Sequence, residues 1–152
     1  MPETVVITDT SCLIVLTKLN VIDVLQKMYS NIIVTTDIAK EFGEPLPDWV
    51  KIMAVSNNKY QQILELTLDK GESSAIALAI ELGDVLLIVD DLKARKESLR
   101  LGLKITGTLG VLIKAKKSGY FSSIKYLLDK LTTIGFHVSE TLKNEILVEC
   151  GE

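Results

Sequence analysis

Five acidic residues are the side chains whose type and spacing could do chemistry: Asp9, Glu41, Glu72, Asp90 and Asp91. Two carboxylates about 4 Å apart repel each other by about 4 kcal/mol at an effective dielectric constant of about 20, so a cluster of them needs a proton or a divalent cation. Carboxylate oxygens are hard ligands that favour Mg²⁺ or Mn²⁺. Such ions activate water and stabilise the in-line transition state of phosphoryl transfer. Because no histidine accompanies the acids, the set argues against a zinc hydrolase.

Apolar runs that alternate with amphipathic segments must position these acids. The segments expected as strands are 4–8, 32–35, 85–89 and 104–106, with an edge strand at 50–55. The segments expected as helices are 11–20, 21–29, 36–43, 57–68, 75–83, 92–101 and 107–117, followed by two more helical patterns between 122 and 150. Asp37 is expected to cap the helix that starts near residue 36. This alternation predicts an α/β fold with three α/β/α layers and a central parallel sheet.

The acids fall where such a sheet places its ligand sites, beyond the carboxyl ends of the strands. Asp9 follows the first strand, and Asp90 and Asp91 follow the strand at 85–89. Glu41 lies in the helix entered after 32–35, and Glu72 lies at the start of an alanine-rich helix. Each also has a plain structural interpretation. Asp9 and one of Asp90 and Asp91 could cap helices, Glu72 could complement a helix dipole, and Glu41 could lie on a solvated face.

Composition narrows the class of protein further. The chain has 152 residues, of which 47% are hydrophobic and 24% charged, as expected for one globular domain over 1–152 with C-terminal helices from about residue 122. A formal net charge of −3 excludes nucleic-acid binding by bulk positive charge. Cys12 and Cys150 are too few for a disulfide framework or a structural zinc site. With no signal peptide and no long apolar run, we expect a cytoplasmic protein without membrane contact.

Five segments stand in an order and spacing that can be compared with known families: 6–11, 34–42, 71–77, 87–91 and 101–110. Together they resemble the PIN-domain family, whose members are metal-dependent ribonucleases that include the toxins of VapC-type toxin–antitoxin pairs. The last three segments look most like a compact prokaryotic subgroup. The resemblance covers roughly residues 4 to 118.

The resemblance implies an acidic pocket that holds Mg²⁺ or Mn²⁺. Asp9 matches the family's first-strand aspartate, Glu41 its helix glutamate, and Glu72 the acid before the alanine-rich helix. Asp91 best matches the aspartate after the fourth strand, with Asp90 as its neighbour or substitute. By this resemblance all five are candidate catalytic residues and metal ligands.

Two features near these acids stay open. Thr10 and Ser11 match the small hydroxyl residues that steady the first acid, although Ser11 could instead only cap the first helix. Many family members carry Thr-x-Asp after the fourth strand, with an aromatic residue shortly beyond. Here Asp90 stands directly before Asp91 and no aromatic residue follows, so the last metal ligand could be either.

The substrate that the resemblance implies is RNA. Candidate RNA-binding residues on the helix after Asp91 are Lys93, Arg95, Lys96 and Arg100. The helix that opens at Thr108 could offer unpaired N–H groups to a phosphate. A homodimer and a small antitoxin are the protein partners that the resemblance implies.

Two other classes compete with a ribonuclease. The first is a catalytically weak or inactive PIN-like module that binds RNA or protein. The second is a phosphoacceptor receiver domain, suggested by the run 86–91 and Arg95. Receiver domains need about a hundred residues after that motif, whereas about 60 follow here, which disfavours them.

Overall fold

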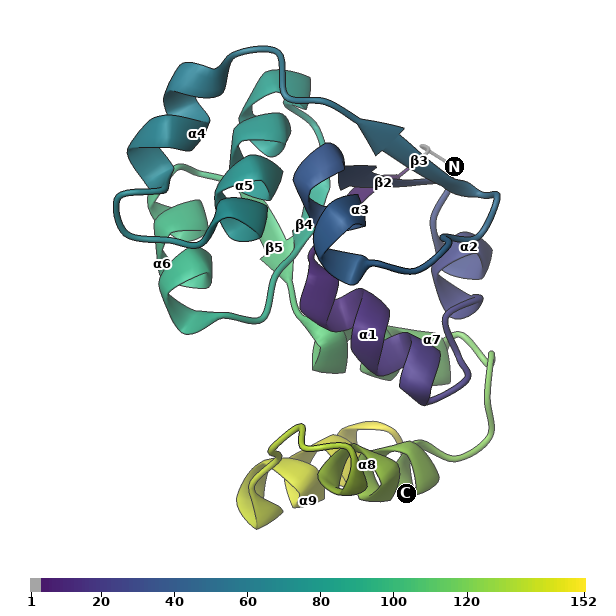
Figure 1. Ribbon diagram of the computed structural model, residues 1–152. Coiled ribbons are helices and arrows are strands. Elements are labelled where there is room, and N and C mark those ends of the chain that lie inside the picture. Colours follow the sequence, from purple (N-terminus) through teal and green to yellow (C-terminus); the bar gives the residue numbers. More distant parts are fainter. Residues whose placement is uncertain (1–3) are drawn as a thin grey trace.

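A five-stranded parallel sheet forms the centre of the computed structural model, which describes residues 4–152 (Figure 1). Its strands are β1 (Val5–Thr8), β2 (Asn31–Thr35), β3 (Val50–Met53), β4 (Leu86–Ile88) and β5 (Lys104–Thr106). They lie in the order β3-β2-β1-β4-β5, and every neighbouring pair is parallel. All five strands match the segments expected from the sequence, and β3 is at an edge.

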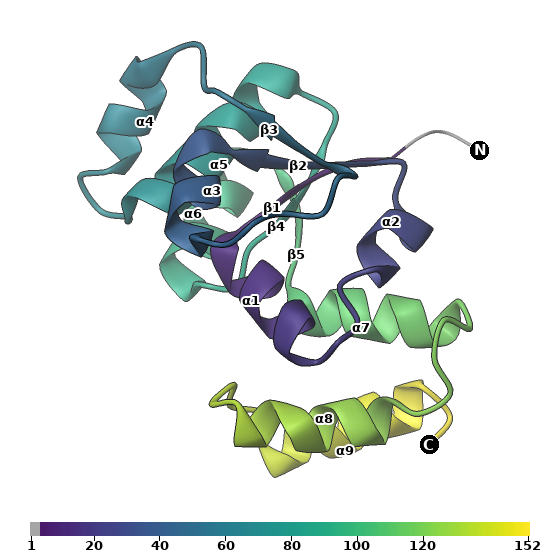
Figure 2. The same ribbon diagram turned by 45° about the vertical axis from the view of Figure 1, so that its right-hand side comes forward.

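Helices cover both faces of this sheet, which confirms the three-layer α/β/α fold (Figures 1 and 2). The helices in the first part of the chain are α1 (Thr10–Lys18), α2 (Val24–Met28), α3 (Thr36–Phe42) and α4 (Asn58–Leu64). Those that follow are α5 (Lys70–Leu82), α6 (Leu92–Arg100), α7 (Thr108–Lys117), α8 (Ile124–Thr133) and α9 (Glu140–Glu149). Helix α5 packs on β1, β2 and β4 and contacts α3, α4 and α6. Helix α7 lies on the other side of the sheet, where it contacts α1 and α2.

The C-terminal helices expected from about residue 122 begin at Ile124. Helices α8 and α9 pack against each other, and α8 contacts α7 (Figure 2). Within residues 4–152, no helix is both long and apolar enough to cross a membrane.

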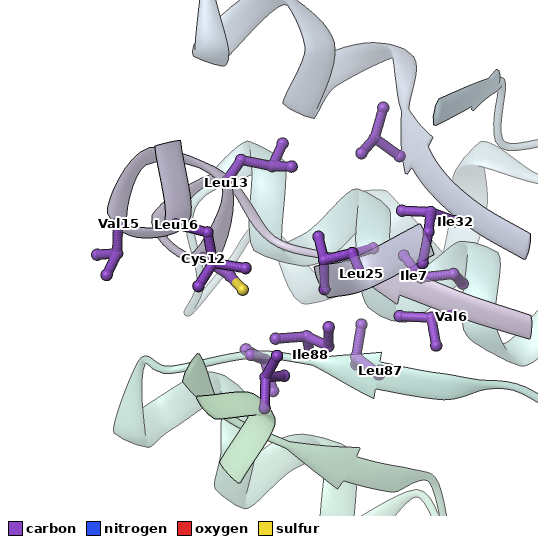
Figure 3. Packing of buried hydrophobic residues seen from close by; sticks show 14 of the residues in the cluster. Val6, Ile7, Cys12, Leu13, Val15, Leu16, Leu25, Ile32, Leu87 and Ile88 are labelled. Atoms are coloured by element: carbon purple, nitrogen blue, oxygen red, sulfur yellow. The ribbon is translucent and has the colours of Figure 1, made fainter. Parts of the chain in front are cut away.

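The core lies between the sheet and its helices (Figure 3). Ile7 of β1 and Leu87 and Ile88 of β4 are fully buried, as are Leu13 and Leu16 of α1. Because both faces of the central strands are covered, these strands consist of continuous apolar runs without polar alternation. The rigid sheet therefore fixes the positions at which β1 and β4 end.

Helix starts differ from the sequence expectation at three places, of which the first is α2, which begins at Val24 rather than at residue 21. The side chain of Thr35, not Asp37, caps α3 by accepting from the N–H of Ile38 at 3.1 Å. Asp37 already lies inside the first turn, where its backbone is helical, so the capping role predicted for it is wrong. Helix α5 begins at Lys70, five residues before the alanine-rich run, because Asp69 provides its N-terminal cap.

Candidate active site

The carboxyl ends of β1 and β4 meet at the point where the strand order reverses. In open parallel sheets this topological switch point forms the ligand crevice, because the chain leaves the two strands toward opposite faces. The N–H of Asp9 donates to the carbonyl of Ile88 at 3.0 Å, which fixes the backbone of Asp9 against β4. Asp9 and Asp90, which are 81 positions apart in the sequence, are thereby brought together.

Asp9 is the central acid of this region. Its Oδ1 accepts from the N–H of Cys12 at 2.9 Å and so caps α1, while its Oδ2 accepts from the N–H of Asp90 at 3.0 Å. The side chain is 6% exposed. One carboxylate therefore joins the ends of two strands and the start of a helix, and its role as a helix cap accompanies its place in the site.

All five predicted acids line one hollow of about 340 Å³. The hollow is lined by Asp9, Thr10, Ser11, Glu41, Asp69, Gly71, Glu72, Asp90 and Asp91. No lysine or arginine is among these lining residues of the described chain. The folded chain thus gathers six carboxylates around one space without a positive side chain in its lining.

Hydroxyl groups hold two of these carboxylates. The hydroxyl of Thr10 donates to Oε1 of Glu41. Thr108 donates twice to Asp90, from its N–H to Oδ1 at 2.8 Å and from its hydroxyl to Oδ2 at 2.5 Å. Both oxygens of Asp90 are therefore engaged, whereas the contacts within residues 4–152 engage only Oε1 of Glu41.

Helix capping holds three others. Asp91 caps α6 by accepting from the N–H of Ala94 at 3.0 Å. Asp69 and Glu72 form a capping box at the start of α5, in which Asp69 Oδ1 accepts from the N–H of Glu72 at 2.8 Å. In the described chain, these hydrogen bonds occupy one oxygen of each side chain and leave the other toward the hollow or solvent.

The electrostatics of the hollow raise the pKa of two acids. Burial, and then the charge of Asp90, raise the pKa of Asp9 to about 7, against the opposing effect of its two N–H donors. Burial, followed by the charges of Asp69 and Asp91, raises the pKa of Glu72 to about 7. Carboxyl groups with pKa values near neutrality, clustered in a cleft, are characteristic of functional sites.

The donor set suits a hard divalent cation, since it consists of carboxylates and hydroxyls without nitrogen or sulfur ligands. Across residues 4–152, no group of three or more His, Cys, Asp or Glu side chains is arranged as a ready-made coordination site. Glu41, Asp69 and Asp91 are exposed, and each keeps one carboxylate oxygen outside the hydrogen bonds described above. The hollow therefore fits a hard divalent cation by the chemistry of its oxygen atoms.

The hydroxyl residues take different roles. Ser11 is exposed and lines the hollow, and Asp9 rather than Ser11 caps α1. Thr108 is fully buried, and its N–H and hydroxyl both donate to Asp90. The expectation that Thr108 contacts RNA is therefore wrong, because its donors already hold a carboxylate of the site.

The basic residues of α6 differ in their exposure and in their contacts. Lys93, Lys96 and Arg100 are exposed, and Arg100 lies 3.5 Å from Glu97. Arg95 is half-buried and donates from Nη1 to the carbonyl of Val89 at 2.8 Å, next to Asp90. Arg95 thus uses this nitrogen to hold the loop that carries Asp90 and Asp91. The sequence had instead predicted a surface contact with RNA.

Sequence reasoning missed Asp69 and Gly71. The signal for Asp69 was present, because Asp-x-x-Glu before an apolar run is the pattern of a capping box. Gly71 carries no such signal, since its role depends on a neighbour 30 positions away. A Cβ atom at Gly71 would lie 3.1 Å from Oε1 of Glu41, so any other residue would push that carboxylate away by a few tenths of an ångström.

Fold and site together define an α/β protein with an acidic ligand site at the switch point of its parallel sheet. A family model described as DUF3368, PIN domain, matches residues 5–152. The chain therefore belongs to the PIN-domain family, as its segments indicated. PIN domains are typically nucleases, act on nucleic acids and generally use divalent metal ions. The comparison with curated proteins gave no match.

Proposed function

We propose that this PIN domain is a metal-dependent ribonuclease that hydrolyses RNA phosphodiester bonds in the acidic hollow, with Mg²⁺ or Mn²⁺ as its ion. The observation that carries the proposal is the gathering of six carboxylates around one space, two of them with pKa values raised to about 7. Such an arrangement is unfavourable in itself, and a divalent cation removes the repulsion.

Asp9, Glu72 and Asp91 would hold the ion, and Glu41 and Asp90 would hold a second ion or orient a water. The hydrogen bonds support Asp91 over Asp90 as the ligand after β4. Both oxygens of Asp90 accept from Thr108, whereas Asp91 uses one oxygen to cap α6 and keeps the other. Asp91 is thereby the freer of the two, although a carboxylate oxygen that accepts one hydrogen bond, as both oxygens of Asp9 do, can still coordinate an ion.

A bound ion of this kind supplies an activated water and stabilises the charge that develops on the phosphate. The residues of the chain do the positioning. Two N–H groups fix Asp9, and the Thr10 hydroxyl fixes Glu41, so the reacting groups need little reorganisation. In-line loss of the 3′ oxygen would leave a 3′-hydroxyl and a 5′-phosphate.

RNA would approach along α6, whose first residues follow Asp91. Lys93, Lys96 and Arg100 are exposed there and supply local positive charge to an otherwise acidic protein. Because the salt dependence of binding scales with the number of phosphates contacted, three such contacts predict a modest decrease in RNA affinity as the salt concentration rises, with a slope of about −2 in log K against log [salt].

The test is cleavage of an end-labelled single-stranded RNA with Mn²⁺, with Mg²⁺ or with EDTA. We expect cleavage with either ion and none with EDTA, and a loss of at least about a hundredfold in Asp9→Asn and Glu72→Gln. Glu145→Gln is the matched control, since Glu145 is exposed on α9. Cleavage that survives Asp9→Asn belongs to a contaminant and refutes the proposal. RNA binding without any cleavage favours the alternative, a non-enzymatic PIN-like module.

A role as the toxin of a VapC-type pair, a small antitoxin partner and a homodimer remain predictions. Exposed apolar side chains such as Ile63 and Leu66, 64% and 82% exposed, are compatible with a protein partner. Light scattering on the purified chain measures the oligomeric state, and a gene for a small DNA-binding protein beside this one would support the toxin role.

A further inference from the structure

A second polar hollow of about 380 Å³ lies beside the acidic one. It is lined by Asp37, Asn58, Gln61, Gln62, Glu65 and Lys70, from α3, from α4 and the turn after it, and from the start of α5. Its volume is within the range of small-ligand sites. Its lining mixes amides, carboxylates and one ammonium group, so it offers hydrogen-bond donors and acceptors together rather than a concentration of one charge.

The two hollows share the same two helices. Helix α3 contributes Asp37 to this hollow and Glu41 to the acidic one, and the start of α5 contributes Lys70 to this hollow and Gly71 to the other. Four helical residues span about 6 Å. A stacked nucleotide advances about 3.4 Å and an extended one advances further, so groups one helical turn apart are within reach of neighbouring nucleotides. A strand whose phosphate lies in the acidic hollow would therefore bring a neighbouring base here.

The hollow contains an amide that is already oriented. Gln61 is 7% exposed, and its Nε2 donates to Oδ2 of Asp37 at 2.8 Å. The ammonium of Lys70 lies 3.7 Å from Oδ1 of the same carboxylate and is largely exposed. Asp37 is thus partnered on both oxygens. One N–H of Gln61 is committed, so its second N–H and its oxygen stay available to a ligand, and among the described residues Glu65 makes no ion pair.

We propose that this hollow binds a guanine base of the RNA, one or two nucleotides from the bond that is cut; the inference rests on the proposed ribonuclease function. Guanine places two neighbouring donors, a ring N–H and an exocyclic amine, on its Watson–Crick edge, and the Glu65 carboxylate can accept both. Lys70 can donate to O6, the usual lysine contact with guanine.

The other bases match this set of groups poorly. Adenine and cytosine present a ring nitrogen acceptor beside their amine, which would face the Glu65 carboxylate without a hydrogen. Uracil presents one N–H between two carbonyl oxygens, which the carboxylate repels. Because Glu65 is exposed and stays hydrated when it is unpaired, the selectivity comes from the two hydrogen bonds that guanine gains and from the repulsion between the carboxylate and the acceptor atoms of the other bases. Single-stranded RNA exposes the edges that such a site would contact.

The first experiment tests the hollow without the metal site. Guanosine, which has no phosphate, is titrated into the isotope-labelled protein in EDTA, and adenosine, cytidine and uridine are titrated in parallel. We expect guanosine to shift the NMR signals of the Gln61 side-chain amide and of α4 at about tenfold lower concentration than the other nucleosides. Glu65→Gln should abolish that preference, whereas the matched exposed substitution Glu145→Gln should retain it.

The second experiment measures kcat/KM for RNA oligomers that differ in one base, guanine or adenine, near the cut. We expect about a tenfold preference for guanine, reduced to near unity by Glu65→Gln and weakened by Lys70→Gln, with Lys125→Gln on α8 as the control for lost positive charge. Guanosine binding no tighter than that of the other nucleosides, or an unchanged preference in Glu65→Gln, overturns the proposal. A chain that cleaves no RNA refutes the ribonuclease function, while the guanosine titration still decides whether the base site exists.

Discussion

Raising the pH from 5 to 8 is expected to destabilise the metal-free protein, because Asp9 must lose its proton in a buried place. Its pKa rises from 3.8 to about 7 on folding. Between these values the folded chain holds a proton that the unfolded chain has released, so the free energy of unfolding falls as the pH rises. The stabilising effect of this proton is complete below pH 3.8 and lost above about pH 7.

The size of the effect follows from the pH window. While the folded chain holds one proton more than the unfolded chain, each pH unit changes the free energy of unfolding by about 1.4 kcal/mol. From pH 5 to the folded pKa of about 7, roughly two such units are crossed, so Asp9 should lower the free energy of unfolding by about 2–3 kcal/mol. Glu72 acts in the same direction, but it is half-buried and screened by solvent, and it should add less than about 1 kcal/mol.

Other groups shifted by folding act outside this window. Hydrogen bonds from the backbone of α8 lower the pKa of Glu152 to about 2, and hydrogen bonding to Lys143 lowers that of Asp129. For both, the stabilisation is lost as the pH falls through the folded pKa and is complete above the unfolded one, below pH 5. Burial raises the pKa of Cys12, which affects stability only above about pH 9.

The assay is urea denaturation followed by the fluorescence of Trp49, the single tryptophan, at each pH in EDTA and then in Mn²⁺. Mn²⁺ should restore more stability at pH 8 than at pH 5, because the ion competes with protons for the same oxygens. Asp9→Asn should flatten the pH dependence in EDTA. A metal-free protein that is equally stable or more stable at pH 8 would refute this electrostatic reasoning.

Three further substitutions separate the site from the scaffold. Gly71→Ala should keep or raise the melting temperature, since alanine favours a helix by about 1 kcal/mol, yet weaken Mn²⁺ binding in calorimetry because its Cβ displaces Glu41. Thr108→Val removes a hydroxyl donor from Asp90 and should lower Mn²⁺ affinity by about 10- to 100-fold; unchanged affinity would show that Asp90 needs no such support. Glu152→Gln weakens the contacts that tie the C-terminus to α7 and α8 and should lower the melting temperature in a thermal scan while RNA cleavage stays the same.

Much of the fold was predictable because its signals are local. The apolar run over β4 indicated a strand covered on both faces, and the helices that follow β1 and β4 showed their apolar spacing in the sequence. Helix boundaries were less predictable. Asp37 and Thr35 are both good capping residues, and the choice between them depends on which one keeps an extended backbone as it leaves β2.

The candidate site was likewise predictable from the sequence only in part. The sequence by itself determined which acids follow the parallel strands, and hence that Asp9 and Asp90 come to one edge of the sheet, because strand ends and helix starts are written in consecutive residues. Only the tertiary structure decided that Asp69 joins them, that Thr108 holds Asp90 and that Gly71 makes room for Glu41. These contacts join residues far apart in the chain, and their geometry depends on how α3, α5 and α7 pack, which no local pattern encodes.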